Sequence, residues 1–109
     1  MAVGDQHFPD TGASLVNDPI TSSASIDDDG ACYYVDTSEG AVTLTVGATT
    51  TAFTVYDSHF NFGMNNCTVD FGGGNTKVMD LDGEIMTFFK DSTDAWRYIS
   101  VGVGSGGEV

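Results

Sequence analysis

Three consecutive residues, Asp57, Ser58 and His59, are of the types that form the catalytic triad of hydrolases. In a triad, the histidine takes a proton from the serine while the carboxylate orients the imidazole. Neighbouring residues at the end of a strand point alternately to opposite sides, so these three cannot form that relay by themselves. We therefore predict an ordinary loop after a strand at this position, and no catalytic residues in the chain.

Two acidic segments, 27–30 and 80–84, place carboxylates beside a glycine, as loops that wrap Ca²⁺ do. Neither segment completes the twelve-residue EF-hand pattern with its final glutamate. His7 and His59 lie far apart in the sequence, which is not the spacing of a zinc site. We predict plain turns, no metal site and no cofactor, with calcium binding by the acidic loops as the alternative.

The chain contains two cysteines, Cys32 and Cys67, and neither has metal-ligand spacing around it. A disulfide between them requires a fold that brings their Cα atoms within about 7 Å. The sequence favours two buried free thiols and leaves a disulfide as the alternative.

The charge of the chain restricts its partners. Three Lys plus Arg stand against sixteen Asp plus Glu in 109 residues, a formal net charge of −13. The cations Lys77, Lys90 and Arg97 form no basic stripe, which argues against nucleic acid as a partner. An anionic lipid surface would repel the chain, and no apolar run approaches the ~20 residues of a membrane span. No signal peptide is recognisable, so we expect a soluble protein made in a cytoplasm.

The length allows one domain, and the pattern of residues predicts an all-β fold. From Ile26 onward, short alternating runs are separated by turn clusters, and no window shows helical periodicity. We predict a small antiparallel β-sandwich or jelly-roll-like domain over residues 25–101, in which a short strand at 78–81 ends in a hairpin turn at Asp82-Gly83. Alternation and side-chain size indicate the candidate core: Val42, Leu44, Phe53, Val69, Phe71, Phe89 and Trp96.

Both ends of the chain depart from the strand pattern. Residues 1–24 hold both prolines and show no sustained period, which predicts an extended N-terminal arm. The apolar residues of this arm are too sparse for a core but suited to pin it onto a partner: Phe8, Leu15, Val16 and Ile20. Residues 102–109 are rich in glycine and predict a C-terminal tail, which is either an edge strand or free.

A series of strand phrases runs in order through residues 25–100. They are an acidic turn at 27–30, Tyr34-Val35-Asp36, the strand 40–45, Phe53-Thr54-Val55, the strand 65–70 with glycines at 72–74, Gly83-Glu84, and 94–99 with its tryptophan. In this order they resemble a β-module of tailed-phage virion proteins, which occurs in head-decoration proteins, head fibres and tail fibres.

The resemblance implies a virion structural protein, usually a trimer, rather than an enzyme. An arm, one module and a short tail make a capsid decoration or cement protein the simplest expectation, one that binds the outer surface of the head as a homotrimer and stabilises the shell. Its partners are then copies of itself and the major capsid protein. In this interpretation the arm residues that contact the shell are Phe8, Leu15, Val16 and Ile20.

An alternative from a different class is a head-fibre or tail-fibre component that acts as a receptor- or carbohydrate-binding adhesin. Sugar rings stack on exposed aromatic side chains, and the sequence offers candidates for such a platform: Tyr33, Tyr56, Phe60 and Phe62. Three of them, coplanar and exposed, would favour this alternative.

Overall fold

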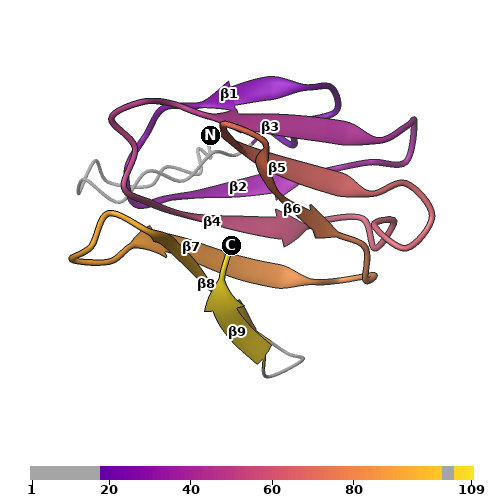
Figure 1. The fold of residues 1–109 in the computed structure, drawn as a ribbon. Helices are drawn as coiled ribbons and strands as arrows, with labels where there is room; N and C mark the ends of the chain where they lie inside the picture. The colour runs from indigo at the N-terminus through magenta and orange to yellow at the C-terminus, as the bar shows by residue number, and fades with distance from the viewer. Residues whose placement is uncertain (1–17, 102–104) are drawn as a thin grey trace, which may run out of the picture.

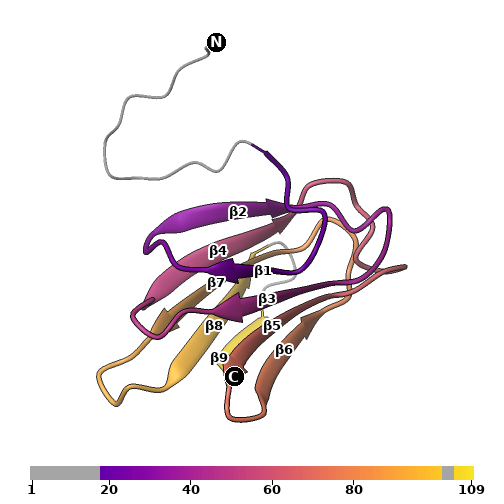
Figure 2. The same ribbon diagram turned by 90° about the horizontal axis from the view of Figure 1, so that it is seen from above.

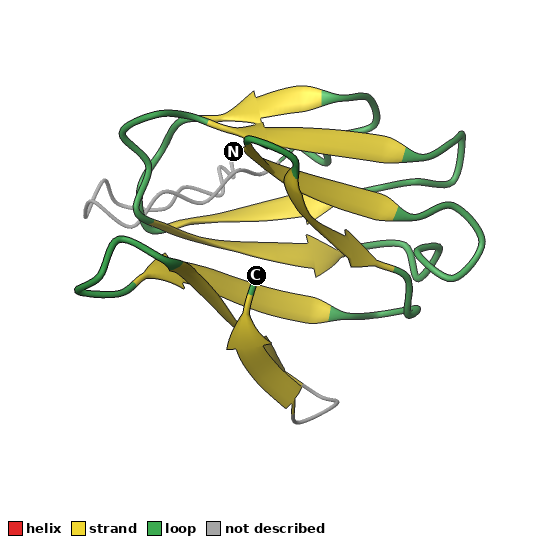
Figure 3. Ribbon diagram, in the orientation of Figure 1, coloured by secondary structure: helices red, strands yellow, loops and turns green. Residues whose placement is uncertain are grey.

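Two facing sheets make up the computed structural model of the chain, which describes residues 18–101 and 105–109 (Figure 1). Within these residues there are nine strands and no helix (Figure 3). The strands are β1 (Ala24–Ile26), β2 (Ala31–Val35), β3 (Val42–Val46), β4 (Ala52–Asp57), β5 (Cys67–Gly72), β6 (Asn75–Met79), β7 (Ile85–Lys90), β8 (Trp96–Val101) and β9 (Ser105–Glu108). The all-β prediction is confirmed, and no helix that could cross a membrane occurs in the described part.

The first five strands alternate between the two sheets. One sheet has the order β1-β3-β5-β6 and the other the order β2-β4-β7-β8-β9. Because the chain crosses to the opposite sheet after each strand, it returns to a sheet in its original direction. Three pairs, β1–β3, β3–β5 and β2–β4, are therefore parallel. The first five strands thus wind back and forth between the two sheets in one direction, an arrangement that we call the parallel coil (Figure 2).

The expected antiparallel pairing holds only for the second half of the domain, where β5–β6, β4–β7, β7–β8 and β8–β9 are antiparallel. The expected hairpin at Asp82-Gly83 is wrong, because β6 and β7 belong to different sheets and these residues lie in the crossing between them. The hairpin that contains β6 joins it to β5 instead, with its turn at Gly73 and Gly74, whose φ angles of 61° and 86° suit residues without a Cβ.

Alternation along the strands directs one set of side chains between the sheets. Of the predicted core, Val42, Leu44, Phe53 and Val69 are fully buried, and Phe71 and Trp96 pack half-buried against the same cluster. Phe89 was predicted for the core and is the exception. In β7, Met86 and Phe88 point inward, so Phe89, one position further along, faces outward.

Phe88 takes the interior position that was expected of Phe89. Its ring stacks on that of Phe53 from the neighbouring strand, with 5.1 Å between the ring centroids. Two adjacent phenylalanines in a strand must face opposite ways, and the alternation of β7 decides which one enters the core.

The domain begins earlier in the chain than expected. The Ile20 N–H donates to the Tyr34 carbonyl at 2.8 Å, and the Ile20 carbonyl accepts from the Asp36 N–H at 2.9 Å. Ile20 thus lies beside the end of β2 and packs against the core, and its expected contact with a capsid stays a prediction. The other arm residues, Phe8, Leu15 and Val16, lie outside the described residues.

The C-terminal residues form an edge strand, one of the two alternatives for this segment. β9 pairs with β8 in antiparallel register, and the Val109 N–H donates to the Trp96 carbonyl at 3.0 Å. The sheet therefore extends beyond Val101, where the sequence placed the end of the β-domain.

Candidate functional site

Three loops meet at one end of the sandwich, which we call the tip. They are the loops 36–41, 58–66 and 80–84, on the right in Figure 1. The parallel pairing of β2 with β4 places Val35 beside Asp57, so the first two loops leave the sheet together. The Asp57 N–H donates to the Glu84 carbonyl at 3.0 Å, which brings in the third loop.

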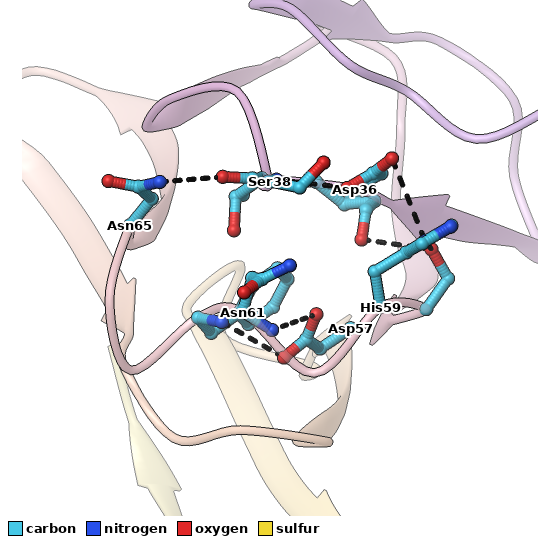
Figure 4. Close-up of polar contacts among 10 residues, drawn as sticks. Asp36, Ser38, Asp57, His59, Asn61 and Asn65 are labelled. Carbon is cyan, nitrogen blue, oxygen red and sulfur yellow. Dashed lines mark hydrogen bonds and ion pairs between the residues drawn. The ribbon is translucent and has the colours of Figure 1, made fainter.

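Asp57 organises the tip from inside. Its side chain is fully buried, and its oxygens accept from the backbone N–H groups of Asn61 at 3.2 Å, Phe62 at 3.0 Å and Gly83 at 2.9 Å. Figure 4 shows this carboxyl group enclosed by the loop that follows it. Buried carboxyl oxygens require such donors, so the role of Asp57 here is to hold two loops in place.

The serine and histidine that follow it do not form a triad. Ser58 Oγ lies 2.8 Å from His59 Nδ1, and the same nitrogen lies 3.7 Å from an oxygen of Asp36 (Figure 4). A triad uses both imidazole nitrogens, one toward the serine and one toward the carboxylate. Ser58 Oγ is also within 3.1 Å of the Val35 carbonyl, to which it donates. The approach of Asp36 depends on the parallel pairing and was not foreseen from the sequence.

The tip presents apolar side chains to solvent. Phe60 is 60% exposed, Met64 82% and Leu81 48%. Phe60 has a φ of 56°, an unfavourable conformation for a bulky residue, and its ring lies against Gly83 so closely that a Cβ there would be 2.9 Å from Cε1. A strained loop with an exposed aromatic ring is typical of a contact site, and only Phe60 of these three was singled out from the sequence.

The aromatic platform suggested for sugar binding is not formed by its four candidates. Tyr33 is 5% exposed and Phe62 is fully buried, while Tyr56 is half-buried in the outer face of its sheet. Phe60 alone of the four is well exposed.

One face of the five-stranded sheet is left uncovered by the residues that the structure describes. We call the outward side chains of β2, β4, β7 and β8 the outer face: Cys32, Tyr34, Ala52, Thr54, Tyr56, Ile85, Thr87, Phe89, Arg97, Ile99 and Val101. Among these residues only Arg97 is charged, and Glu108 of the edge strand β9 lies opposite it in register. By contrast, the corresponding face of the other sheet is polar, with Thr43, Thr45, Thr68 and Asp70 outward.

The apolar residues of the outer face are contiguous. Tyr34, Tyr56, Ile85 and Val101 lie opposite one another across four adjacent strands. The two tyrosine rings meet edge to face with 5.6 Å between centroids, and Val101 is 49% exposed. In the next row Thr54 and Thr87 share a hydrogen bond beside Ile99. These side chains form an apolar row across four strands of the sheet surface.

The acidic loops use their carboxylates to hold backbone groups. Asp29 accepts from the N–H groups of Thr51 at 2.6 Å and Ala52 at 3.3 Å, and the first of these bonds is the main reason its pKa lies below the ordinary value. Asp82 accepts from the Gly63 N–H at 2.8 Å. In residues 18–101 and 105–109 no three His, Cys, Asp or Glu side chains gather as metal ligands would.

Both cysteines are free thiols, so the alternative of a disulfide is not realised. Cys67 is fully buried, and this burial, with smaller contributions from the charges of Asp57 and Glu84, raises the pKa of its thiol to about 12. Cys32 is half-buried on the outer face, not fully buried as favoured from the sequence.

Comparison with models of known protein families finds no match, and neither does comparison with curated proteins. The assignment to phage virion proteins therefore depends on the strand phrases of residues 25–100. The geometry adds two features independent of it, the outer face and the apolar tip.

Proposed function

We propose that this chain is a structural protein of a tailed-phage virion, a capsid decoration or cement protein that binds the outer surface of the head as a homotrimer. The observation that carries the proposal is the outer face, an apolar sheet surface that none of the described residues covers. Monomeric proteins seldom expose large contiguous apolar patches, whereas symmetric oligomers bury them between copies.

The charge of the chain supports a second copy as the occupant of this face. Copies that each carry −13 repel one another wherever carboxylates are brought together. The outward positions of β2, β4, β7 and β8 contain no Asp or Glu, and Glu108 of the edge strand β9 lies opposite Arg97. Copies that meet over these four strands therefore bury no unpaired carboxylate.

The tip is the part of the domain suited to meet the shell. Ile20 lies beside Val35, the last residue of β2, at the same end of the sandwich as the exposed Phe60 and Met64. In a trimer each contact is repeated three times, and linked weak contacts strengthen one another through effective concentration. Attachment of this kind opposes expansion of the shell.

Substitution of one residue in the outer face tests the proposal. We expect Ile99→Glu to convert a trimer into a folded monomer, because three carboxylates would be buried together, and to remove the protein from capsids. Light scattering of the purified protein and co-sedimentation with undecorated capsids measure the two effects. Thr43→Glu introduces the same carboxylate on the polar face of the other sheet. This variant should leave the trimeric state and the binding to capsids unaltered.

A wild-type chain that is monomeric at micromolar concentration and does not sediment with capsids would overturn the proposal. A trimer that sediments with tails instead of heads would support the second candidate, a fibre component that binds a receptor. That candidate is favoured by the parallel coil of the first five strands, since the outer edge of β1 pairs with no described strand and further coils can stack on it.

A further inference from the structure

The exposed apolar side chains of the tip are neighbours on two joined loops. They are Phe60, 60% exposed, Met64, 82%, and Leu81, 48%, and we call them the apolar patch. The Phe60 ring lies against Gly83, which joins the loop of Phe60 and Met64 to the loop of Leu81. Single exposed apolar residues are ordinary on a protein surface, whereas neighbours of this kind mark a surface that a partner can cover.

Side-chain hydrogen bonds hold the three loops of the tip together beneath the apolar patch. Asp82 Oδ1 accepts from the Gly63 N–H at 2.8 Å, and Asn65 Nδ2 donates to the Thr37 carbonyl at 2.8 Å (Figure 4). Loops that are already ordered lose little conformational freedom when they bind, so more of the contact energy remains as affinity.

The border of the apolar patch is acidic. Glu39, Asp80 and Asp82 are exposed, one or more on two of the three loops, and we call them the acidic rim. The loops of the tip contain no Lys or Arg. The cations of the chain lie on strands β6, β7 and β8 instead: Lys77, Lys90 and Arg97. A protein surface that covers the patch therefore meets carboxylates that no cation of the tip neutralises.

We propose that the tip docks onto an apolar surface of a protein partner that is bordered by lysine or arginine side chains. Phe60 and Met64 make the apolar contact, and the carboxylates of the acidic rim meet the basic border. A neutral border would desolvate these carboxylates without a partner, and an acidic border would repel them. The inference rests on the proposed function only in taking this partner to be the shell protein.

A lipid surface is the other class of partner that accepts exposed apolar loops. Membrane-surface sites usually combine their apolar side chains with Lys or Arg, which anionic headgroups attract. The tip has carboxylates in the corresponding place, and this favours a protein partner.

A labelled model peptide tests this chemistry without the shell. A short amphipathic helix of leucine and lysine presents an apolar stripe with a basic border, and fluorescence anisotropy follows its binding to the full-length protein. Two control peptides replace the lysines by glutamine or the leucines by serine. Vesicles of phosphatidylcholine are the lipid probe. The same protein variants are then sedimented with undecorated capsids.

Each variant of the tip has a matched control elsewhere in the chain. Met64→Ser removes an apolar side chain of the patch, and Val78→Ser does so on β6, where Val78 is 44% exposed. The double variant Glu39→Gln with Asp80→Asn removes two carboxylates of the acidic rim. Its control, Asp27→Asn with Asp28→Asn, removes two exposed carboxylates at the other end of the sandwich: Asp27 and Asp28.

We expect only the leucine–lysine peptide to bind saturably. Met64→Ser should weaken its binding about tenfold, because a large apolar side chain no longer leaves water. The double variant of the acidic rim should weaken it about threefold at low salt and less at about 0.5 M sodium chloride. The two control variants should bind the peptide as the wild type does.

The inference is overturned if the leucine–glutamine peptide binds as tightly as the leucine–lysine peptide, or if no peptide saturates below about 1 mM. It is equally overturned if the control variants weaken binding as much as the tip variants do. Saturable binding to the vesicles that Met64→Ser abolishes would overturn it in favour of a lipid partner.

Capsids separate this inference from the proposed function. If the leucine–lysine peptide binds as expected while the protein ignores capsids, the chemistry of the tip stands and the proposed function fails. If capsids bind every variant normally and the peptide does not bind, the inference about the tip alone fails.

Discussion

Asp57 shows how a single residue determines a surface at some distance from itself. Its carboxyl oxygens accept three backbone N–H groups, two from the loop that carries Phe60 and Met64 and one from Gly83 in the neighbouring loop. The apolar side chains of the tip are exposed, whereas the residue that holds them in position is fully buried. In the proposed function, binding through the tip therefore depends on a residue that is itself buried.

We expect Asp57→Asn to lower the free energy of unfolding by about 1–3 kcal/mol, because an amide cannot accept all of these hydrogen bonds and its own N–H groups gain no partner. Urea denaturation measures the change. Glu39→Gln, an exposed acid-to-amide substitution in the same end of the molecule, should stay within about 0.5 kcal/mol of the wild type. Equal urea midpoints for the two variants would contradict a structural role for Asp57.

At the scale of elements, the β7–β8 turn depends on another carboxylate, that of Asp91. It accepts from the Thr93 hydroxyl at 2.6 Å, from Arg97 Nε at 2.9 Å and from the Ala95 N–H at 3.1 Å. The Thr93 hydroxyl and then the Arg97 guanidinium hold the pKa of Asp91 well below its usual range. The turn joins β7 to β8, whose register places Lys90 opposite Trp96, so its geometry matters for the alignment of these two strands.

A lowered pKa in the folded state makes stability depend on pH in one direction. The contribution of Asp91 is fully present above the ordinary aspartate pKa near 3.8 and is lost as the pH falls toward the lower folded value. We expect Asp91→Asn to be less stable than the wild type at pH 7, and the difference to shrink below about pH 4. Thermal unfolding of both proteins between pH 7 and pH 2 measures it. A difference that grows on acidification would show that the hydrogen bonds of the charged carboxylate are not its source.

At the scale of the whole molecule, the charge of the chain would oppose assembly of the proposed trimer, and the outer face would favour it. The described domain measures 40 × 32 × 25 Å. Charges are screened beyond roughly 30 Å at 0.01 M salt but beyond roughly 8 Å at 0.15 M. Most carboxylates of two adjacent copies therefore repel at low salt and are screened from one another at physiological salt.

We expect the trimer to tighten by several-fold between 0.01 M and 0.15 M sodium chloride, because screening removes repulsion while apolar contact is little affected. Sedimentation equilibrium at the two salt concentrations measures the dissociation constant. Weakening by salt would indicate that ion pairs, and not the outer face, join the copies.

The fold itself was accessible from the sequence to the extent that it depends on local alternation. Val42 and Leu44 alternate with threonines, and the structure buries both in β3 as expected. The same pattern arises in parallel and antiparallel strands, because it records only which side chains of one strand share a face. The parallel coil of the first half was therefore missed, and with it the position of Ile20 beside β2.

The candidate sites were less accessible, since each is assembled from distant segments. At the end of the sandwich opposite the tip, Phe71 and Asn75 of one sheet and Trp96 of the other line a groove. The outer face becomes continuous only when four strands align Tyr34, Tyr56, Ile85 and Val101. Alternation within each strand shows which of its side chains share a face, but it does not show which strands are neighbours in the sheet.

The sequence alone determined that this protein is an acidic, all-β domain, because charge and strand alternation are properties of short segments. Only the tertiary structure decided which carboxylate is buried, which of Phe88 and Phe89 enters the core, and which strands pair in parallel. Those outcomes depend on contacts between residues far apart in the chain. Each is settled by the packing of two sheets against one another, which is a property of the whole domain.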